Sequence, residues 1–145
     1  PPPPHPPFPP SSSPSHSFPQ LWVSGNSCRH WVLGAYSQRG TLPSGAPFYQ
    51  SDVSLYWLYY DLDCSGIGLR PSRWVISSVA INASRAADVD GNGECNYVAR
   101  VDSEDAAPPL GTRAWRMLCD NGWEDRQLTI TTPPPPPPAA RRAAH

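Results

Sequence analysis

The chain lacks several features that would point to common classes of protein. It has no lysine, so all 11 of its basic residues are arginines, and its formal net charge is only −1. A charge balance this close to zero gives no basis for a nucleic-acid partner or an anionic membrane surface. No apolar run approaches the roughly 18–20 residues that a helix needs to cross a bilayer. The sequence therefore predicts neither nucleic-acid binding nor a membrane span.

Catalytic motifs are also scarce. Four histidines occur, at His5, His16, His30 and His145. Only His30 lies in the central part of the chain, and a single histidine without a serine-centred motif gives no hydrolase triad. Acidic side chains cluster at Asp61/Asp63 and at Asp102/Glu104/Asp105. A glycosidase uses a pair of carboxylates, so a small wall-modifying glycosidase is an alternative. Solvated turns explain the same acidic residues. We therefore interpret the chain as non-enzymatic.

What the sequence does contain in excess is proline, and its prolines are concentrated at the two ends. The segments 1–20 and 133–145 hold 16 of the 21 prolines. Proline has a fixed φ and no amide hydrogen, so such runs join neither helices nor sheets and form polyproline II. The chain begins with Pro1 rather than Met or a signal peptide, and we expect a processed form or a piece of a longer protein. Residues 1–20 and 133–145 are read as tails or linkers around a module at 21–132.

The central module is rich in β-branched and aromatic residues, and Gly, Pro, Asn, Asp and Ser clusters separate short apolar runs. This spacing predicts an all-β domain, a single disulfide-stapled β-sandwich or barrel-like module, with no helix longer than about two turns. In 55–61 both alternating faces are apolar, which is typical of a strand buried on two sides or of one that exposes an aromatic face. The expected strands are 21–25, 31–36, 46–50, 55–61, 73–81, 95–101, 114–119 and 126–130.

All four cysteines, Cys28, Cys64, Cys95 and Cys119, lie in this module. An even number in a small domain predicts two disulfides and a secreted protein. A zinc site is the competing interpretation, but it needs CxxC-type pairs, which the sequence does not have. Four cysteines allow three pairings. If 95–101 and 114–119 form a hairpin, antiparallel pairing favours Cys95–Cys119 and leaves Cys28–Cys64.

The composition of the tails resembles a known class of protein. The resemblance rests on Pro1–Pro4, on the Pro/Ser mixture Ser11–Ser15, and on Thr131-Thr132 followed by Pro133–Pro138. Together they resemble the extensin and pherophorin class of hydroxyproline-rich extracellular glycoproteins of plants and green algae. The module itself, with Gly34–Tyr36 and Gly45–Tyr49, resembles small extracellular β modules of algae. The likeness of the tails implies a secreted protein of an extracellular matrix, cell wall or cell-surface fibril.

The same resemblance implies covalent glycans on the tails, because prolines in such runs are hydroxylated and glycosylated and neighbouring serines carry sugar. The implied O-glycosylation sites are Pro1, Pro2, Pro3, Pro4, Pro6, Pro7, Pro9, Pro10, Ser11, Ser12, Ser13, Pro133, Pro134, Pro135, Pro136, Pro137 and Pro138. Independently of the resemblance, Asn82-Ala83-Ser84 is a complete N-glycosylation sequon. We expect Asn82 to carry an N-glycan in an extracellular protein.

Six Trp and six Tyr are many for this length. Flat rings with polar edges bind sugars and also line grooves for polyproline, although most of them are expected to pack in the core. The residues expected to be partly exposed, and so to bind a proline tail or a sugar, are Trp31, Phe48, Tyr56 and Trp123.

A calcium loop is a further alternative. Residues 88–94, DVDGNGE, match the first half of an EF-hand loop, in which Asp88, Asp90 and Asn92 would supply oxygens. The twelfth position, where a bidentate Glu should stand, is Ala99. A polar turn between two strands explains the same residues without a metal. No other cofactor is expected.

These observations favour a non-enzymatic structural subunit that self-associates into a homopolymeric fibril through its proline-rich tails and carries N- and O-glycans. Polyproline II rises about 3.1 Å per residue, so a 20-residue tail reaches roughly 60 Å, far enough to touch a neighbouring copy. One alternative is a carbohydrate-binding module with glycosylated linkers and a matrix polysaccharide as partner. The second is the small glycosidase named above.

Overall fold

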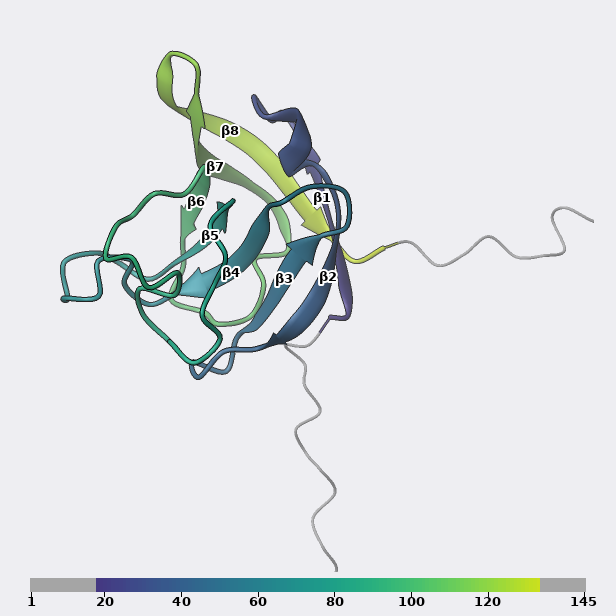
Figure 1. Cartoon of the computed structure of the whole chain (residues 1–145). Coiled ribbons are helices and arrows are strands. Elements are labelled where there is room, and N and C mark those ends of the chain that lie inside the picture. Colours follow the sequence, from purple (N-terminus) through teal and green to yellow (C-terminus); the bar gives the residue numbers. More distant parts are fainter. Residues whose placement is uncertain (1–17, 134–145) are drawn as a thin grey trace, which may run out of the picture.

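The computed structural model describes residues 18–133, which form a closed barrel of eight antiparallel strands (Figure 1). Each strand pairs with the next one along the chain, and β8 returns to pair with β1. The all-β prediction is therefore confirmed in its barrel form. The strands are β1 (Gln20–Gly25), β2 (Gly34–Thr41), β3 (Pro47–Ser51), β4 (Trp57–Asp61), β5 (Arg73–Ser77), β6 (Ala99–Asp102), β7 (Gly111–Cys119) and β8 (Gly122–Thr131).

This up-and-down order places successive connections at alternate ends of the barrel. The β1–β2 and β3–β4 connections and the β7–β8 turn lie at one end, which we call the loop end. The β2–β3, β4–β5 and β6–β7 connections lie at the other, which we call the tail end because β1 starts there and β8 finishes there. The pairing of Trp22 with Thr131 brings the first and last strands side by side. Both tails therefore leave the barrel from neighbouring strands at the same end.

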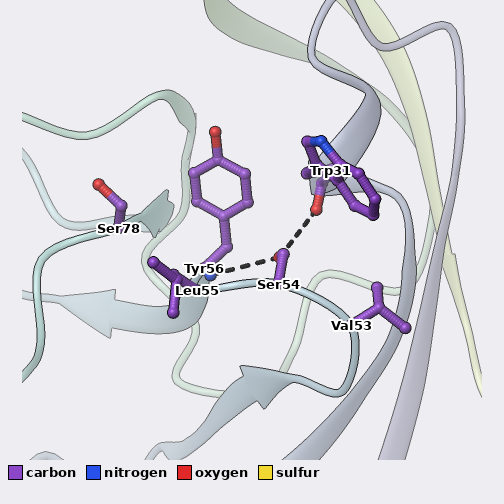
Figure 2. A pocket seen from close by; sticks show the side chains of 6 residues that line it. All are labelled: Trp31, Val53, Ser54, Leu55, Tyr56 and Ser78. Carbon is purple, nitrogen blue, oxygen red and sulfur yellow. Dashed lines mark hydrogen bonds between the residues drawn. The ribbon is translucent and has the colours of Figure 1, made fainter.

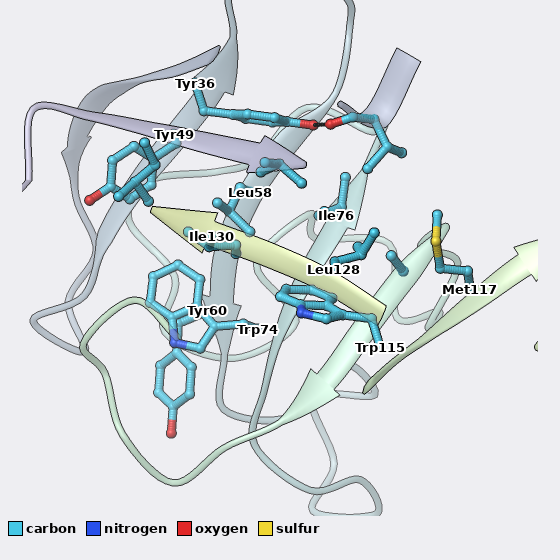
Figure 3. Close-up of a cluster of buried hydrophobic side chains, with 14 of the residues drawn as sticks. Tyr36, Tyr49, Leu58, Tyr60, Trp74, Ile76, Trp115, Met117, Leu128 and Ile130 are labelled. Carbon is cyan, nitrogen blue, oxygen red and sulfur yellow. Dashed lines mark hydrogen bonds between the residues drawn. The ribbon is translucent and has the colours of Figure 1, made fainter. Parts of the chain in front are cut away.

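The barrel interior is filled by large side chains that alternate along the strands (Figure 3). In β1, Leu21 and Val23 are buried while Trp22 between them is exposed, as the two-residue period of a strand requires. Trp74 and Trp115 are fully buried and contribute the largest side chains. An eight-stranded barrel is just wide enough for such side chains to fill it, so the interior is the main hydrophobic core.

A second hydrophobic layer covers the outside of β3, β4 and β5. The long connection 78–98 runs over this face, and its Val89 and Tyr97 pack with Phe48, Tyr59 and Val75. Strand β4 consequently has apolar contacts on both sides: Leu58 and Tyr60 point into the barrel, and Tyr59 points into the outer layer. Of the two alternatives for 55–61, two-sided burial holds for β4, whereas Leu55 precedes the strand and is exposed.

Both disulfides are formed, but the expected pairing is wrong. Cys28 is bonded to Cys119 and Cys64 to Cys95. β6 and β7 do form an antiparallel pair, with Ala99 opposite Met117, but β6 begins only at Ala99. Continued backwards, that register would place Tyr97 opposite Cys119. Moreover, Cys119 faces the barrel interior, whereas Cys95 belongs to the outer layer, so the two sulfurs lie on different sides of the sheet.

Two further expectations need correction. The strand expected at 31–36 starts only at Gly34, because η1 (His30–Val32), a 3₁₀ turn, precedes it; the amides of Val32 and Leu33 bond back to Arg29 and His30. η1 is the only helical element in residues 18–133.

Phe48, expected to be partly exposed, is only 6% exposed. Its ring lies over Gly40, where an added Cβ would stand 2.9 Å away, and the outer layer covers it.

Candidate functional site

Several large apolar side chains remain exposed around η1 and the β3–β4 loop. We define the Trp31 surface as Trp22, Trp31, Leu33, Val53, Leu55 and Tyr56. The exposed fraction is 59% for Trp31, 58% for Val53 and 77% for Leu55, and Trp22 reaches 41%. Clustered exposed apolar residues of this size mark binding surfaces more often than isolated ones do.

Trp31 is presented by a segment that is firmly attached to the barrel. Its neighbour Val32 is fully buried, and the buried Tyr36 hydroxyl donates a 2.7 Å hydrogen bond to the Val32 carbonyl. Burial raises the pKa of Tyr36, so the hydroxyl stays protonated and remains a donor. On the other side, Cys28 is bonded to Cys119 and the Arg29 Nε donates to the Leu118 carbonyl at 2.6 Å. Trp31 therefore stands on a fixed base.

The β3–β4 loop is held just as closely. The Ser51 hydroxyl oxygen accepts hydrogen bonds from the amides of Val53 and Ser54. The Ser54 hydroxyl donates to the Trp31 carbonyl at 2.9 Å and accepts from the Tyr56 amide. Figure 2 shows Ser54 between Trp31 and Tyr56, with both of these bonds drawn. The loop and η1 are thus one unit, and a ligand that binds there would not have to order either of them.

Two shallow hollows meet at Trp31. One is lined by Trp31, Val53, Leu55 and Tyr56 together with Ser54 and Ser78 (Figure 2). The other is lined mainly by Trp22, Trp31, Leu33 and Val53, with His30 and Ser24 as its polar side chains. Because Trp31 and Val53 belong to both, the two hollows form one continuous apolar surface with Trp31 at its centre.

This surface combines flat rings with a few hydrogen-bond donors. The Trp31 indole N–H and the Tyr56 hydroxyl make no hydrogen bond to any residue between 18 and 133, so both can bond a ligand. The His30 ring packs edge-on against Trp31, with ring centroids 5.0 Å apart. Aromatic grooves with such donors recognise polyproline II by contacting proline rings and bonding the free carbonyls between them.

The sequence-predicted aromatic residues separate into two groups. Trp31 and Tyr56, both expected to be partly exposed, come together on the Trp31 surface. That they bind a proline tail or a sugar stays a prediction. Trp123 is partly buried elsewhere, edge-on to Tyr97 and under the Arg100 guanidinium, which lies 5.0 Å from its ring. Phe48 is buried. Trp22 was missed, although it stands between the apolar Leu21 and Val23 in a strand, and that alternation indicates an outward side chain.

The acidic residues near 61–63 have a structural role. The buried Asp61 carboxylate accepts bonds from the amides of Asp63, Asp88 and Val89, which fastens the connection 78–98 to the end of β4. Burial raises the pKa of Asp61. The Asp63 carboxylate accepts from its own loop, from the Ser65 hydroxyl and from several amides including that of Arg70, and these bonds lower its pKa. Both carboxylates are therefore engaged by the protein's own donors.

The second acidic group, Asp102, Glu104 and Asp105, lies at the tail end of the barrel, where β6 finishes. The exposed Asp102 pairs with Arg73 at 3.2 Å. The Asp105 carboxylate accepts a bond from the Ala107 amide and so closes a turn. These contacts fit the solvated-turn interpretation for Asp102, Glu104 and Asp105, whereas Asp61 and Asp63 are buried rather than solvated.

The candidate calcium loop forms a turn whose oxygens bond its own backbone. Asp88 accepts from the Gly93 amide and pairs with Arg85, Asp90 accepts from the Asn92 amide, and Asn92 accepts from the Glu94 amide. Burial, with the neighbouring Asp88 carboxylate, raises the pKa of Asp90 to about 6. Among the described residues, no group of three His, Cys, Asp or Glu side chains could hold a metal ion.

The modification sites differ in what the structure says of them. Asn82 is exposed, and its side-chain oxygen accepts bonds from the Ser84 amide at 3.0 Å and the Ser84 hydroxyl at 2.6 Å. This Asx turn presents the sequon to solvent, and the N-glycan itself stays a prediction. Of the O-glycosylation sites, only Pro133 belongs to the described residues. Those in 1–17 and 134–138 lie outside them.

In residues 18–133, no helix is long and apolar enough to cross a membrane. No protein-family model, curated protein or solved structure matches this chain, so its function has to be inferred from the Trp31 surface and the sequence around the barrel.

Proposed function

We propose that this chain is a non-enzymatic structural subunit of an extracellular glycoprotein fibril, matrix or cell wall. In this proposal, subunits assemble when the Trp31 surface of one binds a proline-rich segment of another. The observation that carries it is an exposed, rigidly held aromatic surface on a barrel whose own sequence ends in proline runs. The two disulfides and the absence of a membrane-spanning helix among residues 18–133 are compatible with secretion.

The physical fit is between two preorganised partners. A polyproline II segment has few conformations to lose, and its backbone carbonyls have no internal hydrogen bonds. Trp31 and Tyr56 offer ring faces to proline rings and an N–H and an O–H to those carbonyls. Since Ser54 and the Cys28–Cys119 disulfide already fix both aromatic residues in place, binding costs little ordering on either side.

A carbohydrate-binding module with glycosylated linkers is the second candidate, because exposed Trp rings such as Trp22 and Trp31 also stack on sugars. Sugar sites usually add several polar side chains that bond the hydroxyl groups. The two hollows are lined mostly by apolar residues, and their polar side chains are serines and His30. This lining favours proline rings over sugars.

The test is a tryptophan-fluorescence titration of the full chain with a synthetic decaproline peptide and, separately, with soluble β-linked oligosaccharides. We expect the peptide to bind and Trp31→Ala to weaken its binding by about tenfold or more, as loss of an aromatic anchor does. Leu69→Ala is the matched control, because Leu69 is 70% exposed but lies on the β4–β5 loop at the tail end. Failure of decaproline to bind, or equal binding by Trp31→Ala, would refute the proposal. Oligosaccharide binding that requires Trp31 would establish the second candidate.

A further inference from the structure

We infer that the segment held by the Trp31 surface is the C-terminal tail, beginning at Pro133, of a second copy of this chain. The inference rests on the proposed function and adds the identity and direction of the partner segment. It draws on three observations: where the tails leave the barrel, what their sequences carry, and which charges flank the Trp31 surface.

The topology places Trp22 of the Trp31 surface opposite Thr131, but Trp31, Val53, Leu55 and Tyr56 are carried by η1 and the β3–β4 loop. β8 finishes at the tail end, whereas η1 and the β3–β4 loop lie at the loop end. Thr132 precedes a proline, so its backbone is restricted to extended conformations and disfavours a reversal. The six prolines that follow favour an extended rod. A tail that continues in the direction of β8 would therefore lead away from Trp31, so we assign the Trp31 surface that it binds to another copy.

Charge distinguishes the two tails. Residues 1–17 contain no Arg, Lys, Asp or Glu, while the C-terminal tail carries Arg141 and Arg142 shortly after its prolines. Beside Val53, the exposed Asp52 carboxylate accepts hydrogen bonds from the Gln20 amide and the Ser37 hydroxyl, which are both neutral. Its negative charge is thus available to an arginine. A proline run followed by arginines matches an apolar surface flanked by a carboxylate, and the N-terminal tail does not.

The connection to the barrel also favours the C-terminal tail. Only Thr132 separates β8 from the first proline of the run. The N-terminal prolines are instead joined to β1 through the serine-rich residues 11–17. A contact between the tail end of one copy and the loop end of the next is heterologous. It leaves one free surface and one free tail at the two ends, so it propagates into a polar filament.

A complementation experiment with the full chain tests this directly. By sedimentation velocity, we expect the wild-type chain to form oligomers that grow with concentration. Trp31→Ala removes the surface and deletion of 134–145 removes the tail, so each should weaken association by about tenfold or more. Mixed together, the two variants should form a one-to-one complex, because one still supplies a tail and the other a surface. Deletion of 1–17 should leave association within about twofold of wild type.

Charge variants refine the test. Asp52→Arg should weaken association. Combining it with Arg141→Glu and Arg142→Glu should restore association. The control is Glu104→Arg, which makes the same charge change on the exposed β6–β7 loop at the tail end. Undiminished association without 134–145, or no complex on mixing, would overturn the inference. Binding of a synthetic 1–17 peptide but not of a 131–145 peptide would overturn it and leave the proposed function standing. If neither peptide nor decaproline binds, the proposed function itself fails.

Discussion

The two disulfides close chain loops of very different size, and their removal should therefore have unequal consequences. Cys28–Cys119 spans 91 residues and Cys64–Cys95 spans 31. From the loop-closure entropy of the unfolded chain, these separations correspond to about 4.6 and about 3.7 kcal/mol of stabilisation. The variant Cys28→Ala/Cys119→Ala should thus lose about 0.9 kcal/mol more free energy of unfolding than Cys64→Ala/Cys95→Ala.

Urea denaturation of the full-length variants, followed by tryptophan fluorescence, measures this difference. Thiol titration of the unfolded chains provides the internal control. Each double variant should show no free thiol, since it removes both partners of one bond. With the pairing expected from the hairpin argument, removal of Cys28 and Cys119 would leave two unpartnered thiols. A loss for the 64–95 variant that equals or exceeds the loss for the 28–119 variant would refute the loop-entropy reasoning.

Three other predictions follow from burial, titration and the sequon. Trp115→Ala should cost about 3–5 kcal/mol because the side chain fills the barrel interior, whereas Trp31→Ala should stay within about 0.5 kcal/mol; urea midpoints measure both. Asp90 has a pKa of about 6 in the folded chain and about 3.9 when unfolded, so the folded state binds more protons between these values. Stability should consequently fall as pH rises from about 4 to 6, and Asp90→Asn should flatten that slope. Chain from its natural source should lose mass on N-glycosidase treatment; unchanged mass, or a loss that persists in Ser84→Ala, contradicts glycosylation at Asn82.

Sequence patterns predicted the strands wherever local alternation and turn residues agree. The apolar residues of 55–61 indicated a strand with two apolar faces, because successive residues of a strand lie on opposite faces, and β4 buries side chains on both. The disulfide pairing could not be read in this way. It depends on where β6 begins and on which face each cysteine occupies, and both are set by the long connection 78–98, whose path is fixed by the buried Asp61 carboxylate.

The candidate site was predicted in part. Trp31 and Tyr56 were expected to be exposed, but nothing local brings residue 31 beside residues 53–56; the closure of the barrel and the Ser54 bond to Trp31 do. The exposure of Phe48 was predicted wrongly because Gly40 and the outer layer, which bury its ring, belong to other segments of the chain. The exposure of a side chain depends on residues that are distant in the sequence. Whether a strand residue points inward or outward can instead be predicted from its neighbours in the sequence.

The adjacency of the first and last strands determines how the barrel responds to force. A pull on the two tails is applied to β1 and β8 at the same end, so their ladder opens like a zipper, one pair at a time, rather than resisting as a whole. Peeling stops at the covalent link between Cys28 and Cys119. Only residues 18–28 and 119–133 can be drawn out, which gives roughly 80 Å of slack at about 3.4 Å per residue. When its two tails are pulled, the barrel is therefore a short extensible spring with a covalent stop, and the chain between the two cysteines is shielded from that tension.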